Sequence, residues 1–204
     1  MGNKINRTAV VIIGGGLAGL YAANQLKSRK IKYELFDSKS LFGGRVAGIP
    51  KASPDGVNDP VYKVPQDIQF YDLGPAWIFP QHTLMQELIQ HMGLSFFPQY
   101  SHGDVLYQFV NTKELRRISN PQNERLYRIK NGVYALIKAL VNNVNSKNLH
   151  PKHKAIRVIK DANAWRVICI VDNVEKHTLC QHVIFTLPPR IVARDFCEAS
   201  WMNS

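Results

Sequence analysis

Residues 9–26 read AVVIIGGGLAGLYAANQL, and this stretch decides the fold. A short run of apolar, mostly β-branched residues leads into three consecutive glycines, and a helical pattern of apolar residues begins directly after them. Such a run is typical of a central parallel strand that is covered on both faces. The sequence therefore predicts a strand, a glycine turn and a helix in direct succession.

The glycines Gly14, Gly16 and Gly19 have the spacing G-x-G-x-x-G, which a dinucleotide-binding fold requires for three separate reasons. The first glycine permits a tight turn, the second lets a phosphate approach the backbone, and the third lets helix and strand pack closely. The helix begins at Leu17 and Ala18, and its first N–H groups and partial positive charge suit a pyrophosphate. We expect these five residues to bind phosphates.

A second strand, KYELFD, ends at Asp37, about 20 residues beyond the glycine turn, and Ser38 follows it. A carboxylate at this place accepts hydrogen bonds from ribose hydroxyls. It also disfavours a 2′-phosphate, which argues against NADP. A glycine-rich turn without a ligand is the alternative, but the full order of strand, glycines, helix, strand and acid favours a dinucleotide.

The stretch SLFGGRVAG, residues 40–48, favours FAD over NAD. In a simple nicotinamide-binding domain strands and helices keep alternating, whereas here Gly43, Gly44 and Arg45 arrive before a helix can form. Two glycines permit close backbone approach, and a guanidinium is a forked donor for a phosphate or for the polar edge of a flavin. Farther along, FYDLGPAWIFP predicts a short strand and then a rigid bend, formed by Gly74, Pro75, Ala76 and Trp77.

In DSKSLFGGR and DLGPAW the sequence resembles the flavin-containing amine oxidase superfamily, which includes monoamine, polyamine and L-amino acid oxidases. The resemblance implies an α/β, Rossmann-like FAD-binding fold with a parallel sheet and part of an inserted α+β substrate domain. It implies a discontinuous FAD-binding domain at residues 8–80 and 130–190, a partial substrate-domain insertion at 81–129 and a tail at 191–204.

Carried over residue by residue, the resemblance implies that Gly14, Gly16 and Gly19 line the pyrophosphate and that Asp37 holds the adenosine ribose. It also implies that Gly44 and Arg45 meet the pyrophosphate and the ribityl part. The remaining implied contacts are a bend near the isoalloxazine and backbone near the adenine, at Gly74, Pro75, Ala76, Trp77 and Ala155.

The resemblance further implies an oxidoreductase that oxidises a C–N bond of an amine or amino acid by hydride transfer to FAD. The family normally continues beyond the stretch TLPPRIVARDFCEASWMNS, and its later part supplies a flavin-facing lysine and a closing glycine-rich segment. We therefore expect a chain that is truncated relative to the family, with cofactor-binding residues but no identifiable catalytic residue. A second hypothesis is a non-catalytic flavin- or nucleotide-binding protein, or a subunit completed by a partner chain.

The composition excludes several other classes. The 204-residue chain has a net charge of +11, but its Lys and Arg residues are scattered, so we expect no nucleic-acid binding. No apolar run approaches the ~18 residues of a membrane span, and we expect a cytoplasmic protein. Three cysteines and seven histidines match no metal or redox spacing, so we expect buried reduced thiols and no metal site.

The rest of the chain reads as ordinary structure. A capping box from Thr83 to Gln86 predicts the start of a helix that Gly93 ends. A second amphipathic helix is expected over residues 133–144, and the proline-rich residues 48–66 predict a long surface loop, an insertion rather than an active-site cover. The first of these helices carries an apolar stripe that we expect in the core, formed by Leu84, Leu88 and Met92.

Overall fold

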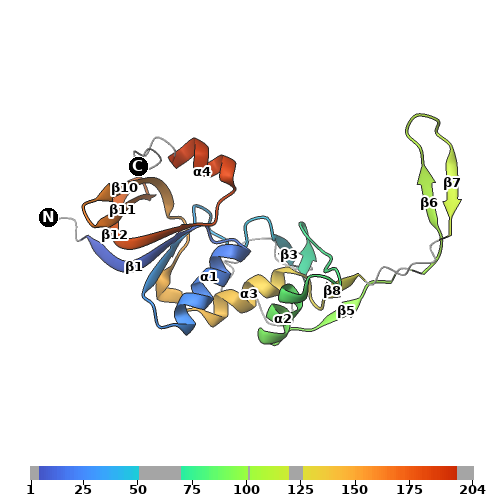
Figure 1. Ribbon diagram of the computed structural model, residues 1–204, viewed down its shortest axis with the longest axis horizontal. Coiled ribbons are helices and arrows are strands. Elements are labelled where there is room, and N and C mark those ends of the chain that lie inside the picture. The colour runs from blue at the N-terminus through green and yellow to red at the C-terminus, as the bar shows by residue number, and fades with distance from the viewer. Residues whose placement is uncertain (1–4, 51–69, 101, 120–125, 197–204) are drawn as a thin grey trace.

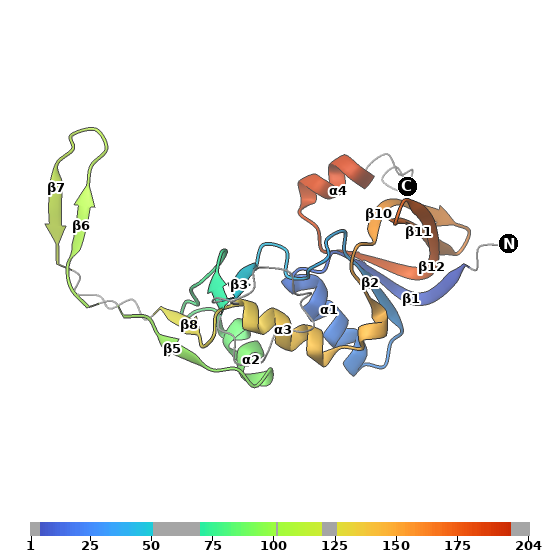
Figure 2. The same ribbon diagram turned by 180° about the vertical axis from the view of Figure 1, so that it is seen from behind.

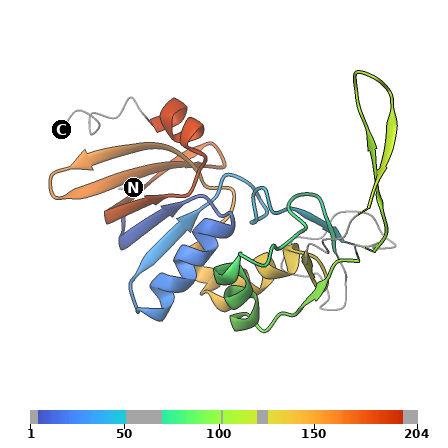
Figure 3. The same cartoon turned by 45° about the vertical axis from the view of Figure 1, so that its right-hand side comes forward.

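The computed structural model describes residues 5–50, 70–100, 102–119 and 126–196. Within these residues, a mixed sheet with helices against both of its faces forms the body of the molecule (Figure 1). A hairpin stands well away from this body, and Figure 3 shows the same separation from a second angle. The described chain is therefore an α/β fold with a protruding arm.

The predicted Rossmann-like arrangement is confirmed at the centre of the sheet. The four parallel strands are flanked on one side by an antiparallel pair, so the sheet is mixed. The antiparallel part arises because the chain meanders through two strands before its last strand returns beside the first. In spatial order the strands are β10 (Lys154–Asp161), β11 (Ala164–Val171), β12 (Val174–Phe185), β1 (Asn6–Ile13), β2 (Tyr33–Phe36) and β9 (Leu149–His150).

Two helices, α1 (Leu17–Ser28) and α3 (Tyr134–Asn143), lie side by side against one face of the sheet, as Figure 2 shows from behind. The buried amide of Asn24 joins them, because its Nδ2 donates to the carbonyl oxygens of Leu20 (2.8 Å) and Leu140 (3.1 Å). The predicted amphipathic character of α3 is confirmed. Its buried face consists of Tyr134, Leu136, Ile137, Leu140 and Val141.

The other face of the sheet is covered by α4 (Pro189–Phe196), which begins at the double proline after β12. The ring of Phe196 packs edge-on against Phe185, with 5.2 Å between the ring centroids. Helix α4 includes residues 191–196 of the tail that the resemblance implies, and its last residue, Phe196, packs in the second core layer.

Two of the three cysteines lie in this second core layer. Cys169 and Cys180 are buried and free, as the sequence predicts, while Cys197 lies outside the described residues. Burial raises the pKa of the Cys169 thiol to about 12 and that of the Cys180 thiol to about 11. Both thiols therefore stay protonated at neutral pH and are unreactive.

Short strand pairs complete the described chain. One side of the protruding hairpin is a strand within DVLYQFVN, residues 104–111. Residues 51–66 of the predicted surface loop lie outside the described residues. The pairs are β3 (Gly48–Pro50) with β4 (Phe70–Asp72), β5 (Phe96–Pro98) with β8 (Tyr127–Ile129), and β6 (Val105–Gln108) with β7 (Leu115–Ile118), and a 3-10 turn, η2, covers Ser146–Asn148.

The start of helix α2 (Thr83–His91) differs from the capping box predicted from the sequence. The N-cap residue is His82 and not Thr83, and no side chain caps the helix. The side chain of Gln86 instead donates to the carbonyl oxygens of Phe79 and Pro80. The predicted capping box is wrong because the preceding turn folds back beneath the helix and takes the Gln86 amide.

The prediction that the apolar stripe of α2 lies in the core is wrong for Leu84. Leu84 is 79% exposed, and the buried residue of the helix is Ile89. Periodicity identifies an apolar face but does not show whether anything covers it, which is why the core assignment fails for Leu84. The predicted end of the helix is confirmed, since Gly93 follows it with a φ of +71°.

Candidate functional site

The predicted site lies where the parallel strands end. The carboxyl ends of β1, β2 and β12 meet at one edge of the sheet, which is where open α/β sheets bind their ligands. Main-chain hydrogen bonds tie the three ends together: the Gly14 N–H donates to the carbonyl oxygen of Phe36 (2.9 Å), and the Thr186 N–H to that of Ile13 (3.0 Å). Loops from three strands therefore share this edge.

Two glycines of the G-x-G-x-x-G turn are required by the protein itself, and the third faces open space. Gly14 has a φ of +111°, which L side chains rarely adopt. A Cβ on Gly19 would come 1.9 Å from the carbonyl oxygen of Gly14, so helix and turn touch there. A Cβ on Gly16 would meet only the carbonyl oxygen of Gly43, at 3.8 Å, so the space in front of Gly16 is open.

The N-terminus of α1 faces this open space without compensation. Its N-cap residue is Gly16, no side chain caps it, and its first turn contains no acidic residue. The N–H groups of Leu17 and Ala18 belong to the first turn, where a helix cannot satisfy its own donors. The arrangement is a ready anion site.

A second glycine loop lies directly against the first. The Gly43 N–H donates to the carbonyl oxygen of Gly15 (2.8 Å). Gly44 has a φ of +61°, and a Cβ there would lie 3.6 Å from the Cα of Gly16. Arg45 follows with an exposed side chain that forms no ion pair with any described residue. The structure thus brings the loop that carries Arg45 next to the glycine turn.

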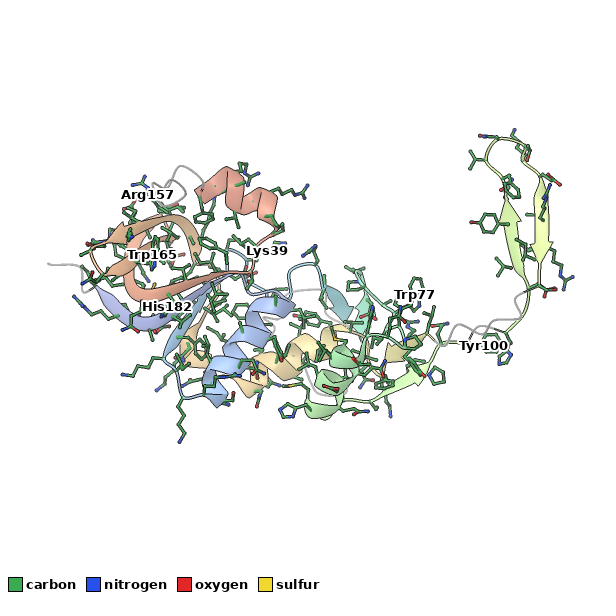
Figure 4. The ribbon with its side chains drawn as sticks, in the orientation of Figure 1. Lys39, Trp77, Tyr100, Arg157, Trp165 and His182 are labelled. Atoms are coloured by element: carbon green, nitrogen blue, oxygen red, sulfur yellow. The ribbon has the colours of Figure 1, made fainter. Side chains whose placement is uncertain are left out.

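The bend predicted near a flavin ring packs on this second loop. A Cβ on Gly74 would lie 2.2 Å from the carbonyl oxygen of Arg45, so glycine is required for the contact. Pro75 is exposed, Ala76 is half-buried and Trp77 is 57% exposed. Figure 4 shows Trp77 well to the side of Lys39, so the two ends of the candidate site are spread along the molecule.

Asp37 lies at the end of β2 with its carboxylate turned toward the glycine turn. Its Oδ2 accepts a hydrogen bond from the Gly15 N–H (2.6 Å), and its Oδ1 accepts one from the Lys39 N–H (2.8 Å). Ser38 between them is exposed. Because a carboxylate oxygen can accept more than one hydrogen bond, Asp37 retains capacity for a hydroxyl donor.

The segment after β9 forms the wall beside Asp37. The His153 N–H donates to the carbonyl oxygen of Asp37 (2.8 Å), and its ring stacks on Phe36 with 5.6 Å between ring centroids. Burial lowers the pKa of His153, so its ring is neutral at neutral pH. Ala155 follows at the start of β10, half-buried beside a bulge. The position implied for adenine is therefore close to Asp37 in the fold.

Two further residues support the site, and the sequence pattern assigned neither of them a role. The hydroxyl of Thr186 donates to the carbonyl oxygen of Gly14 (2.8 Å) and lies 3.1 Å from that of Ile13. The buried carboxylate of Asp72 accepts a hydrogen bond from the Val133 N–H (2.6 Å) at the start of α3. The only signals are a threonine that ends a strand before two prolines, and an acid that ends a short strand.

Other features of the described residues bear on function only indirectly. A groove of about 680 Å³ runs between α1 and α2, lined in part by Tyr21, Leu84, Leu88 and Met92. No group of metal-ligating side chains occurs within the described ranges. Among the described helices, none has the length and apolar character that a membrane crossing requires.

A family model described as flavin containing amine oxidoreductase matches residues 17–124, which is more than half of the chain. The chain belongs to this family. The resemblance seen in the sequence is thereby confirmed, and FAD is the cofactor that the family implies.

Curated relatives agree. The chain is 33% identical over 114 residues to a probable flavin-containing monoamine oxidase A of Dictyostelium discoideum, a match that covers 56% of this chain and 22% of that protein. It is 26% identical over 98 residues to a putrescine oxidase of Kocuria rosea, covering 48% of this chain and 17% of that protein. The matches thus span about a fifth of the length of these relatives.

Solved structures show the same fold at low identity. Wild-type putrescine oxidase bound to putrescine aligns with a TM-score of 0.73 at 13% identity, over 95% of this chain and 61% of that chain. Cyclohexylamine oxidase from Brevibacterium oxydans aligns with a TM-score of 0.72 at 13% identity, over 94% of this chain and 60% of that chain. At this identity the comparison concerns the fold alone.

The residues at the sheet edge fit FAD. The open space before Gly16, the uncapped start of α1 and the exposed side chain of Arg45 suit a pyrophosphate. The carboxylate of Asp37 suits ribose hydroxyls. The individual contacts of these residues with FAD remain predictions.

Substitution of Gly16 and of Gly19 distinguishes a glycine that leaves room for a ligand from one that the packing of the protein requires. Gly16→Ala should leave the melting temperature of the apoprotein nearly unchanged, because its Cβ meets only one atom at 3.8 Å. It should weaken FAD binding at least tenfold, about 1.4 kcal/mol, because the methyl group takes the space where phosphate must approach. Thermal denaturation and flavin-fluorescence titration measure the two effects.

Gly19→Ala is the matched control. Its Cβ overlaps the Gly14 carbonyl oxygen, so it should lower the melting temperature of the apoprotein, as overpacked cores do. Full FAD affinity in Gly16→Ala would show that the pyrophosphate does not lie at this turn.

Proposed function

We propose that this chain forms the FAD-binding part of an oxidoreductase that oxidises the C–N bond of an amine or amino acid. The observation that carries the proposal is the open space enclosed by Gly16, the uncapped start of α1 and the loop at Gly44 and Arg45. FAD, when bound, accepts the hydride that leaves the carbon next to the amine nitrogen.

In this proposal each loop has a separate role toward the cofactor. The N-terminus of α1 and Arg45 neutralise the pyrophosphate, with Arg45 reaching the ribityl part as well. Asp37 accepts hydrogen bonds from the adenosine ribose, and backbone near Ala155 contacts the adenine. The bend that ends at Trp77 lies near the isoalloxazine. The chain's own contribution is thus to bind and orient the cofactor.

The substrate class rests on the relatives. Their names are monoamine oxidase, putrescine oxidase and cyclohexylamine oxidase, and each name refers to an amine. We therefore propose a small amine or amino acid as substrate and a cytoplasmic location. The buried free thiols of Cys169 and Cys180 agree with a reducing compartment.

Replacement of the ribose carboxylate tests the cofactor assignment. Asp37→Ala should weaken binding of FAD about 10- to 150-fold, because loss of a charge-assisted hydrogen bond costs roughly 1.5–3 kcal/mol. ADP should compete with FAD, and its affinity should fall by the same factor, because both ligands share the adenosine ribose. Fluorescence titration with FAD and competition with ADP measure these affinities.

Glu87→Ala is the control for this experiment, because Glu87 is an exposed acid on α2 that lines the groove. It should bind both ligands as the wild type does. Equal affinities in Asp37→Ala and wild type would remove Asp37 from the ribose site and undermine the dinucleotide assignment.

The exposure of Trp77 favours a second element of the proposal, a partner chain that completes the site. A flavin ring beside this side chain would face water. Hydride transfer from an amine to the flavin is slow in a site that does not exclude water. With FAD in excess, this chain alone should release peroxide from monoamines, polyamines and L-amino acids at less than about 1 s⁻¹, the low end of typical enzyme rates. Faster turnover would show that the chain already forms a closed active site without a partner.

A further inference from the structure

The buried carboxylate of Asp72 is not among the groups that the proposed function assigns to the cofactor. Its side chain is only 4% exposed. A buried carboxylate is costly unless hydrogen bonds or an opposite charge satisfy it, whereas an apolar side chain would fill the same space without that cost. Asp72 ends β4 and directly precedes the bend of residues 73–77. The partners of this carboxylate indicate what it does there.

Helix α3 begins without a cap of its own. Its N-cap residue is Val133, whose side chain cannot cap it, and its first turn contains no acidic residue. The Oδ1 atom of Asp72 accepts the hydrogen bond of the Val133 N–H (2.6 Å) from 61 positions earlier in the chain. A negative charge is favourable at a helix N-terminus. Asp72 therefore supplies from a distant segment the cap that the local sequence KNGVY lacks.

The bend is attached at both of its ends to the segment of residues 127–133. Before the bend, the Asp72 carboxylate bonds to Val133, and the guanidinium of Arg128 on β8 lies 3.8 Å from its Oδ2 atom. After the bend, the main chain of Ile78 exchanges two hydrogen bonds with that of Tyr127, each of 2.8 Å. Only the first of these attachments depends on a side chain of the bend's own segment.

The start of α3 also supports the second glycine loop. A Cβ on Gly43 would lie 3.3 Å from the ring of Tyr134 and 3.5 Å from the side chain of Ile137, so the loop rests on the first turns of the helix. The bend in turn contacts this loop, because the Leu73 N–H donates to the carbonyl oxygen of Ala47 (2.9 Å). One helix start therefore supports both the loop assigned to the pyrophosphate and the bend assigned to the flavin ring.

We propose that Asp72 is a positioning residue that sets the place of the bend, and with it that of the isoalloxazine, relative to the pyrophosphate. It acts through its hydrogen bond to the Val133 N–H, because this bond joins the bend to the helix start on which the second glycine loop rests. Asp72 itself does not touch the cofactor. The inference rests on the proposed function, in which the pyrophosphate lies at the glycine turn and the flavin ring lies near the bend.

A purely structural role of Asp72 leads to a different expectation. Helix α3 continues into η2 and β9, which lead to the wall beside Asp37. If Asp72 only stabilised the helix, its loss would disturb the adenosine end as well, and ADP and FAD would bind more weakly by the same factor. If it positions the bend, its loss affects only the part of FAD that ADP lacks. The ratio of the two affinities therefore distinguishes the two roles.

Asp72→Ala and Asp72→Asn in the full chain test the proposal. Asp72→Ala removes the acceptor, so the affinity for FAD should fall about tenfold, because the ring site is no longer preorganised, while the affinity for ADP stays that of the wild type. Asp72→Asn keeps an acceptor oxygen and should retain the FAD affinity of the wild type. Flavin-fluorescence titration and ADP competition measure the affinities. Flavin-fluorescence anisotropy at saturating FAD should fall in Asp72→Ala alone, because its ring is held less firmly.

Asn145→Ala is the matched control. It also removes a side-chain cap, at the turn η2 beyond the other end of α3, where the Asn145 side chain accepts a hydrogen bond from the Lys147 N–H (3.0 Å). It should leave both affinities and the anisotropy unchanged.

Three results would each overturn the proposal: an equal loss of ADP and FAD affinity in Asp72→Ala, an unchanged FAD affinity in that variant, or a failure of Asp72→Asn to retain FAD affinity. A loss of anisotropy in Asn145→Ala equal to that in Asp72→Ala would also overturn it. If the unsubstituted chain bound no FAD, the proposed function would fail, and this inference with it.

Discussion

Gly19 lies so close to Gly14 that no side chain fits between helix and turn, and the rest of the structure depends on this contact. The carbonyl oxygen of Gly14 occupies the space that a Cβ on Gly19 would need. Helix α1 can therefore begin directly above the end of β1, with its N-terminus at the edge of the sheet. A helix displaced by one methyl group would no longer present its first N–H groups to the space in front of Gly16.

The second loop and the bend are built outward from that contact in order. Gly43 bonds to Gly15 through its N–H, and Gly74 packs on the carbonyl oxygen of Arg45. Each step needs a glycine because backbone meets backbone with no room for a side chain. The candidate site is thus a stack of three backbone segments, and its side-chain contributions are few: the carboxylate of Asp37 and the guanidinium of Arg45.

Much of the candidate site could be predicted because its elements follow one another directly in the sequence. Strand, glycines, helix, strand and acid are adjacent in the sequence, so their pattern alone identifies the turn and Asp37. The hydroxyl of Thr186 bonds to Gly14 across 172 positions, and no local pattern reports that contact. The prediction that Leu84 lies in the core failed for a related reason. The local sequence shows that the helix has an apolar face, but it does not show which other segment, if any, packs against that face.

The central claim is that the glycine turn, Asp37 and the Gly43–Arg45 loop form one dinucleotide site. Hydrogen–deuterium exchange of the full chain with and without FAD tests it most directly, because it reports on every main-chain N–H at once. The account predicts that FAD slows exchange in residues 14–19, 37–39 and 43–47 together. It predicts no change of exchange in α2, which lines the groove. Protection in α2, or in only one of the three segments, would contradict it.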